Sequence, residues 1–91
     1  MKVVLSRRAD LDLMAQIDWL EALSPRAARA AERAIRDQFK ALEAFPAAGR
    51  AIGVEDRKWP IPFGRDGFVA IYRIEADRIV IGRIFHCRQD R

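Results

Sequence analysis

Two helix-forming segments of this chain meet at Ser24-Pro25, with almost no residues between them. A serine hydroxyl caps the first turn of a helix, and proline is well tolerated at the first helical position. Helices joined this closely must fold back on each other as an antiparallel hairpin. We therefore expect one helix over residues 7–23 and a second that continues to about Phe45.

Both expected helices have an apolar face, because apolar residues recur at spacings of three and four. In the first helix these residues are Ala9, Leu13, Met14, Ile17, Leu20 and Leu23. In the second they are Ala28, Ala31, Ile35, Phe39, Leu42 and Phe45. The cations Arg26, Arg29, Arg33, Arg36 and Lys40 follow the opposite face of the second helix. We interpret this cationic face as solvated, with contact to phosphates or an acidic partner as the alternative.

The first helix also carries a second, weaker apolar stripe. Its members are Leu11, Ala15, Trp19 and Ala22. Two stripes on one helix present more apolar surface than a two-layer fold buries. The sheet, the C-terminal tail or a partner protein must therefore cover this stripe.

Outside the two helices the apolar period changes to two, which indicates strands. The expected strands are residues 3–5, 57–63, 68–74 and 78–86. Pro60 and Pro62 place the second of these at a sheet edge, since proline has no N–H to donate. The last is apolar on both faces in its middle, as expected of a central strand. Tyr72, in the third, is expected to be a core residue.

These elements predict an α+β fold in the order β-α-α-β-β-β. The helical hairpin packs on one face of a small, mostly antiparallel sheet. With 91 residues, of which 51% are hydrophobic, we expect a single domain over residues 1–91.

Composition narrows the functional classes. The formal net charge is +4, which suits an anionic partner or simply favours solubility. Cys87 is the single cysteine, so an internal disulfide and a cysteine-based zinc site are both excluded. No stretch approaches the roughly 20 apolar residues of a membrane span. We expect a cytoplasmic protein with no membrane contact, no metal and no cofactor.

The last strand ends in a group of polar and charged side chains. His86, the only histidine, is followed by Arg88 and Arg91, and Arg83 precedes it by three residues. Guanidinium groups pair well with carboxylates and phosphates. This end of the sheet either binds a charged partner or anchors the C-terminus.

Short patterns occur in a defined order along nearly the whole chain. They are Ala9-x-x-Asp12-Leu13-x-x-x-Ile17-x-Trp19, Pro25-x-Ala27-Ala28, Leu42-x-x-x-Pro46-x-x-Gly49-Arg50, Gly67-Phe68, Ile71-Tyr72-Arg73-Ile74, Ile84-x-His86 and Arg88-Gln89-Asp90. In order and spacing they resemble the RelE/ParE superfamily of bacterial toxins. The resemblance implies the toxin of a type II toxin–antitoxin pair, neutralised by an antitoxin whose C-terminal segment wraps it.

The two branches of this superfamily act differently. RelE-like members cut mRNA in the ribosomal A site, whereas ParE-like members act on DNA gyrase and are not known as nucleases. Nuclease members often carry a basic residue where this chain has Val69, and several carry tyrosine where it has Cys87. The resemblance therefore favours a ParE-like gyrase inhibitor. The alternatives are a ribosome-dependent mRNA endonuclease and a non-toxic antitoxin-binding module.

The resemblance also suggests roles for the two surfaces. Leu11, Ala15, Trp19 and Ala22 are expected to bind a ParD-like antitoxin, as a docked helix or beside an added strand. Arg83, His86, Arg88 and Arg91 are expected to contact the gyrase target. We expect no sequence-specific DNA binding by this chain alone.

A nuclease would use the same end of the sheet. Metal-independent RNA cleavage needs proton transfer and stabilisation of phosphorane charge at one phosphate. The residues available for that chemistry are His86 as acid or base, with Arg73, Arg83 and Arg88 as charge stabilisers. A second proton donor beside His86 is missing from the sequence pattern.

Overall fold

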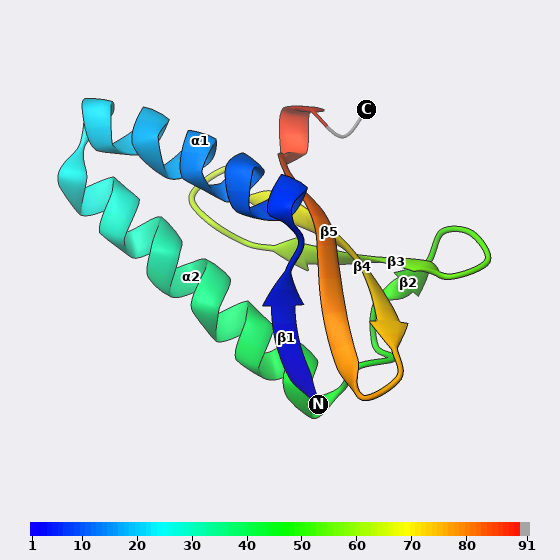
Figure 1. Ribbon diagram of the computed structural model, residues 1–91. Helices are drawn as coiled ribbons and strands as arrows, with labels where there is room; N and C mark the ends of the chain where they lie inside the picture. The colour runs from blue at the N-terminus through cyan, green and yellow to red at the C-terminus, as the bar shows by residue number, and fades with distance from the viewer. Residues whose placement is uncertain (90–91) are drawn as a thin grey trace.

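The structure is a computed structural model that describes residues 1–89. Figure 1 shows a helical hairpin that covers one face of a twisted sheet, while no α-helix of residues 1–89 lies on the other face. The elements are β1 (Lys2–Leu5), α1 (Arg7–Leu23), α2 (Pro25–Ala44), β2 (Arg50–Ala51), β3 (Asp56–Ile61), β4 (Phe68–Glu75), β5 (Arg78–His86) and the 3₁₀ turn η1 (Cys87–Gln89). None of the helices in the described part of the chain is long and apolar enough to span a membrane.

Within residues 1–89 the sheet has five strands in the order β1-β5-β4-β3-β2. β1 pairs with β5 in parallel, and the other neighbours are antiparallel. This confirms the expected α+β fold and the central place of β5. β2 was not predicted, because its two residues are too few to show a period. It pairs with Arg57 and Lys58, so the prediction that this whole segment is an edge was wrong for its first half.

Serine side chains set both helix starts. Ser6 accepts a hydrogen bond from the Ala9 N–H at 3.0 Å, and Ser24 accepts one from the Ala27 N–H at 3.2 Å. Ser24 is at once the C-cap of α1 and the N-cap of α2, so the expected hairpin forms without a loop.

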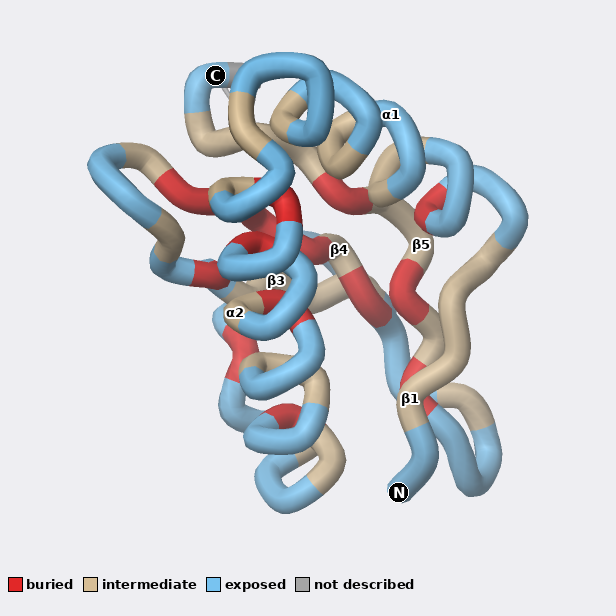
Figure 2. Tube along the Cα trace, turned by 90° about the vertical axis from the view of Figure 1, so that its left-hand side faces the viewer, coloured by how far each residue is buried: buried red, intermediate tan, exposed pale blue. Residues whose placement is uncertain are grey.

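The core lies between the hairpin and the sheet, where the buried segments face each other in Figure 2. The largest fully buried side chains are Tyr72, Phe68, Leu42, Ile61, Ile79, Ile81 and Ile84. Three residues predicted for the helix core are instead exposed, namely Met14, Leu23 and Phe45. Met14 lies at the margin of its apolar face, and Leu23 lies at the hairpin tip, which projects past the sheet (Figure 1). Phe45 follows the end of α2 and no longer keeps the helical phase.

Tyr72 fastens the loop that leaves α2. Its buried hydroxyl donates to the Pro46 carbonyl at 2.7 Å and accepts from the Gly49 N–H at 2.9 Å. Arg57 donates to the carbonyls of Ala47 and Gly49 in the same loop. A Cβ on Gly49 would collide with the Tyr72 ring, so glycine is needed at this close approach. The predicted core position of Tyr72 is thus confirmed.

A β-bulge alters the pairing expected for the last hairpin. From the turn, Glu75 pairs with Arg78, and the same register places Tyr72 beside Ile81. The register then shifts between Ile71 and Tyr72, so Ile71 pairs with Arg83 instead of Gly82. The bulge adds a residue to one strand and increases its local twist. The extra residue is Gly82, which lies between the part of β5 that pairs with β1 and the end that carries His86.

Candidate binding cleft

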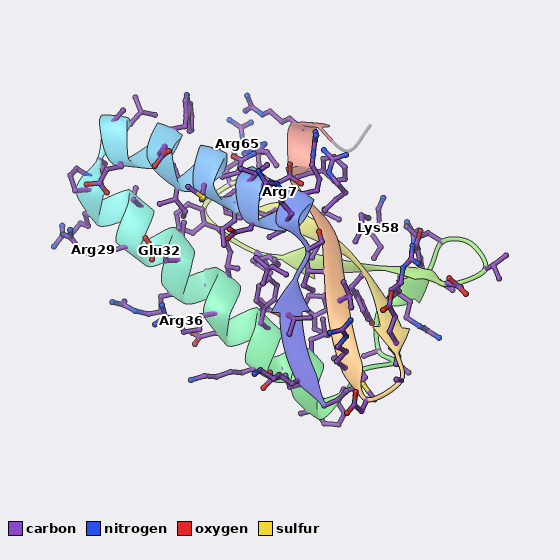
Figure 3. All side chains as sticks on the ribbon, viewed as in Figure 1. Arg7, Arg29, Glu32, Arg36, Lys58 and Arg65 are labelled. Carbon is purple, nitrogen blue, oxygen red and sulfur yellow. The ribbon has the colours of Figure 1, made fainter. Side chains whose placement is uncertain are left out.

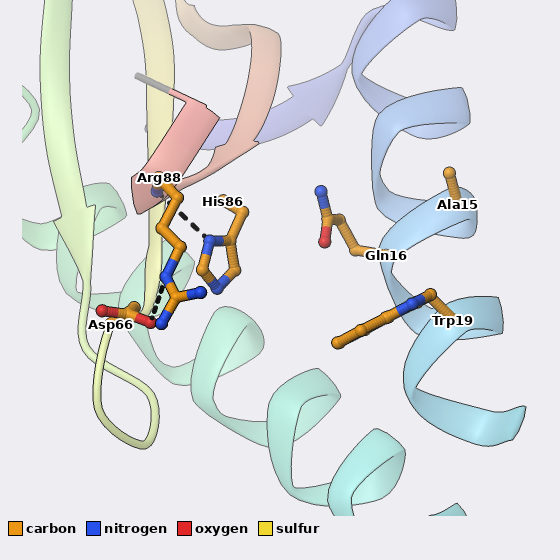
Figure 4. A pocket seen from close by; sticks show the side chains of 6 residues that line it. All are labelled: Ala15, Gln16, Trp19, Asp66, His86 and Arg88. Atoms are coloured by element: carbon orange, nitrogen blue, oxygen red, sulfur yellow. Dashed lines mark hydrogen bonds and ion pairs between the residues drawn. The ribbon is translucent and has the colours of Figure 1, made fainter. Parts of the chain in front are cut away.

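A cleft of about 590 Å³ lies between α1 and the C-terminal end of the sheet. Its lining residues are Ala15, Gln16, Trp19, Asp66, His86 and Arg88. Figure 4 shows Gln16 and Trp19 extending from α1 toward His86 and Arg88, with Asp66 reaching in from the β3–β4 loop. The cleft thus joins two surfaces that the sequence analysis had treated separately.

The α1 wall of the cleft belongs to an exposed apolar stripe. Leu11, Ala15, Trp19 and Ala22 are all exposed, and Trp19 retains 61% of its accessible surface. The sheet does not cover the stripe, which leaves an apolar surface available to a partner. A large aromatic side chain in such a position is a typical anchor for a protein interface.

His86 forms the opposite wall at the end of β5. Its ring meets the Phe68 ring edge to face, with 5.9 Å between centroids. The backbone N–H of Arg88 donates to Nδ1 of His86 at 3.2 Å. In the neutral imidazole the proton therefore resides on Nε2, which makes that atom a hydrogen-bond donor rather than a base.

Arg88 is the cation of the cleft. Its Nε lies 3.1 Å from Oδ2 of Asp66, and the Arg88 side chain is 67% exposed. Exposed pairs of this kind contribute typically about 0–1 kcal/mol, because water already stabilises both charges. The guanidinium is therefore held only loosely by its own chain.

Arg83, three residues before His86, is engaged in a different ion pair. Its Nε donates to Oδ2 of Asp12 at 2.8 Å, and its guanidinium carbon lies 4.5 Å from the centroid of the Phe85 ring. The Asp12 carboxylate also accepts the Ile84 N–H at 3.0 Å. The pairing of β1 with β5 ends at Leu5, whereas β5 continues to His86. Beyond that point, the Asp12 carboxylate accepts the β5 N–H that a neighbouring strand would otherwise bind. We call the Asp12–Arg83–Ile84 contacts the brace.

The pKa of Asp12 reflects these contacts. Burial alone raises the pKa of this carboxyl group. The hydrogen bonds from Arg83 and Ile84, with the positive charges of Arg83 and Arg8, outweigh burial and hold the pKa of Asp12 below its ordinary value. Asp12 is thus the charged partner that keeps the end of β5 against α1.

Arg73 lies away from the cleft. It pairs with Val80 in the sheet, whereas Phe68 pairs with His86, so five residues of β4 separate the two positions. At roughly 3.3 Å per residue this separation is about 16 Å. The Arg73 side chain instead contacts Glu55 and Asp56, both at 3.5 Å. The four residues named for a nuclease therefore do not converge, since only His86 and Arg88 line the cleft.

Arg91, predicted to contact the target, lies outside the described residues. Asp12 and Asp66 received no role from the sequence, because an acidic residue in a helix or a turn usually faces solvent. Within residues 1–89 no histidine, cysteine and acidic side chains gather as a group of three that could hold a metal ion.

The cationic face of α2 is spread out rather than gathered around a pocket. In Figure 3, Arg29 and Arg36 extend from the outer side of α2 with Glu32 between them. All three are exposed. This placement agrees with the interpretation as a solvated face.

Comparison with known proteins identifies the family. The family described as ParE toxin of the type II toxin–antitoxin system parDE matches residues 3–91. The protein named Toxin RelE1 from Caulobacter vibrioides is 33% identical over 89 residues, which cover 98% of this chain and 96% of that protein.

A solved structure gives the same answer for the fold. The chromosomal ParDE toxin–antitoxin system from P. aeruginosa contains a chain with a TM-score of 0.75 and 32% identity, matched over 94% of this chain and 95% of that one. Together these matches confirm the resemblance to the RelE/ParE superfamily. The chain belongs to the ParE toxin family of type II toxin–antitoxin systems.

Proposed function

We propose that this toxin inhibits DNA gyrase by binding it, without cleaving RNA, and that a ParD-like antitoxin neutralises it by covering the cleft. The observation that carries the proposal is the composition of the cleft. It combines an exposed aromatic anchor, Trp19, with a histidine donor and one loosely held arginine. Such a surface suits recognition of a protein carrying carboxylates.

The geometry argues against the nuclease alternative. Nδ1 of His86 is occupied as an acceptor, and Arg83 and Arg73 are paired with carboxylates. Val69, in a position where nucleases often carry a basic residue, is buried beside Pro60 and Phe85. Stabilising a phosphorane needs several donors at one point. Of the four residues named for a nuclease, only His86 and Arg88 line the cleft.

The antitoxin part of the proposal rests on the exposed stripe Leu11, Ala15, Trp19 and Ala22. Trp19 and Ala15 belong both to this stripe and to the cleft that contains His86 and Arg88. An antitoxin seated on the stripe would therefore cover the residues proposed to contact gyrase. Because gyrase and ribosomes are both cytoplasmic, the proposed site of action is the cytoplasm.

Controlled expression of the chain without an antitoxin tests the function. We expect an early DNA-damage response while protein synthesis continues, and we expect Arg88→Gln to weaken this response. Asp56→Asn, which alters a carboxylate outside the cleft, serves as the control. Immediate arrest of translation with cuts in A-site codons would instead establish the endonuclease. An absence of any effect would favour a non-toxic antitoxin-binding module.

A further inference from the structure

The ion pair between Arg88 and Asp66 lies across the cleft from Trp19 (Figure 4). Asp66 is the only acidic side chain that lines this cleft among the described residues. We propose that Asp66 is an internal placeholder, which a carboxylate from an acidic amphipathic helix of the antitoxin replaces on Arg88. The apolar side of that helix then packs on Trp19. This inference rests on the antitoxin part of the proposed function.

The charge of the site favours an acidic occupant. His86 presents a donor, and Arg88 is mostly exposed and paired with one carboxylate. The chain as a whole carries a formal charge of +4, which attracts an acidic segment over a distance. Exchange of one carboxylate for another leaves Arg88 paired throughout, and the released Asp66 carboxylate, whose side chain is 30% exposed, remains in contact with water.

The strand edges favour a helix over an added strand. On the outer edge of β1, the Val3 N–H already donates to Oε2 of Glu43 at 2.9 Å. Where β5 extends beyond β1, the Ile84 N–H already donates to Asp12. On the β3 edge, the Asp56 carbonyl already accepts a hydrogen bond from the Ile52 N–H next to β2. Pro60, four residues later on the same edge, has no N–H to donate. Each of these edges lacks a donor that an incoming strand would need.

The α1 wall has the shape that a helix requires. Leu11, Ala15 and Ala22 lie along one line of α1, with Trp19 beside it, and the small alanines allow close approach of a second helix. Glutamates placed next to leucines on the incoming helix would reach the guanidinium of Arg88. The occupant is therefore defined by two properties, an apolar stripe and an adjacent acid.

The inference predicts that removing Asp66 strengthens binding. The probes are two synthetic helical peptides of about 20 residues, long enough to form helix on a surface. One carries leucines four residues apart with glutamates beside them, and the other has glutamine in place of every glutamate. Calorimetry measures the affinity of each peptide for the parent chain and for its Asp66→Asn variant.

We expect Asp66→Asn to bind the glutamate peptide about three- to fivefold more tightly, as expected for release from an exposed ion pair. Its affinity for the glutamine peptide should stay unchanged. Asp56→Asn makes the same change in net charge outside the cleft, and it should leave both affinities unchanged. In the double variant with Arg88→Gln, the gain should disappear. Trp19→Ala should weaken binding of both peptides.

Several results would overturn the inference. An equal gain for both peptides, an equal gain with Asp56→Asn, or no binding at millimolar concentration would each do so. If Asp66→Asn raised the affinity only for a short oligonucleotide, the site would be assigned to phosphate instead. If the variant associated with itself more strongly, the site would be assigned to a second copy of the chain. Because this test measures peptide binding alone, failure of the gyrase proposal leaves its outcome unaffected.

Discussion

Two arginine–aspartate pairs lie near the end of β5, and they differ in almost every physical respect. The Arg83–Asp12 pair is short, at 2.8 Å, and its carboxylate side chain is only 13% exposed. The Arg88–Asp66 pair is longer, at 3.1 Å, and its arginine is mostly in water. The first pair holds strand and helix together, whereas the second leaves its guanidinium available to a partner.

The comparison shows that burial of the carboxylate, rather than the charge of the arginine, separates an ion pair within the fold from one at the surface. The Asp12 carboxylate is largely shielded from water, and it contacts Arg8, Arg83 and the Ile84 N–H. Removing one partner from such a site leaves the others unsatisfied. Asp66 stays in contact with solvent, so water replaces whatever is removed.

Asp12→Ala is expected to have the largest effect. It leaves the Ile84 N–H and the Arg83 guanidinium without their acceptor and should lower the free energy of unfolding by about 2–3 kcal/mol. Urea denaturation at neutral pH measures this change. Asp66→Ala is the matched control and should cost less than about 1 kcal/mol. Equal losses in the two variants would remove the distinction between the pairs.

Arg83→Met should give a smaller loss, because methionine keeps an apolar side chain beside Phe85 and Ile84 still donates to Asp12. We expect a decrease of about 1–2 kcal/mol in the free energy of unfolding. Hydrogen exchange at the Ile84 amide provides a second measurement, and the amide should exchange faster in this variant. Unchanged stability and exchange would mean that Arg83 has no part in the brace.

The brace should depend on pH in one direction. The pKa of Asp12 in the folded chain lies below its ordinary value of 3.8, so its contribution to stability is present above that value. The contribution is lost as the pH falls through the folded pKa, because protonation then favours the unfolded state. The stability difference between the parent and Asp12→Asn, about 1 kcal/mol at neutral pH, should therefore shrink below pH 3.8. A constant difference down to the acid transition would contradict this account.

Arg88→Met should have the smallest effect on folding. We expect the free energy of unfolding to change by less than about 0.5 kcal/mol, as for most exposed positions. In the same variant, affinity for the glutamate peptide should fall, which separates binding from stability. A large loss of stability would place Arg88 with the brace instead of the cleft.

Much of the architecture was predictable from local chemistry. Ser24-Pro25 defines the hairpin, and the change of period from 3.6 to 2 defines the strands, because both signals depend on neighbours in sequence. The buried place of Tyr72 also followed from its position within an apolar strand. The family patterns then identified the toxin superfamily, which the comparisons confirmed.

The features that the sequence did not predict correctly share a cause. Met14, Leu23 and Phe45 have the spacing of core residues, but the sheet does not extend over them. β2 follows the loop after α2, which Tyr72 and Arg57 hold beside the sheet. The bulge before Tyr72 likewise depends on how two strands meet. Each depends on the position of a distant element, which a local pattern does not contain.

The sequence by itself determined the two helices, four of the five strands in the described residues and the family, since those depend on periodicity, caps and spaced residues. Only the tertiary structure decided how the arginines are paired and how far they are exposed. Arg83 and Arg88 looked alike in the sequence, but Asp12 is 71 residues from Arg83 in the chain and meets it only through the packing of α1 on β5. The same packing brings Trp19 to His86 and makes one cleft of two surfaces. Long-range contacts set burial, and burial sets the strength of an ion pair.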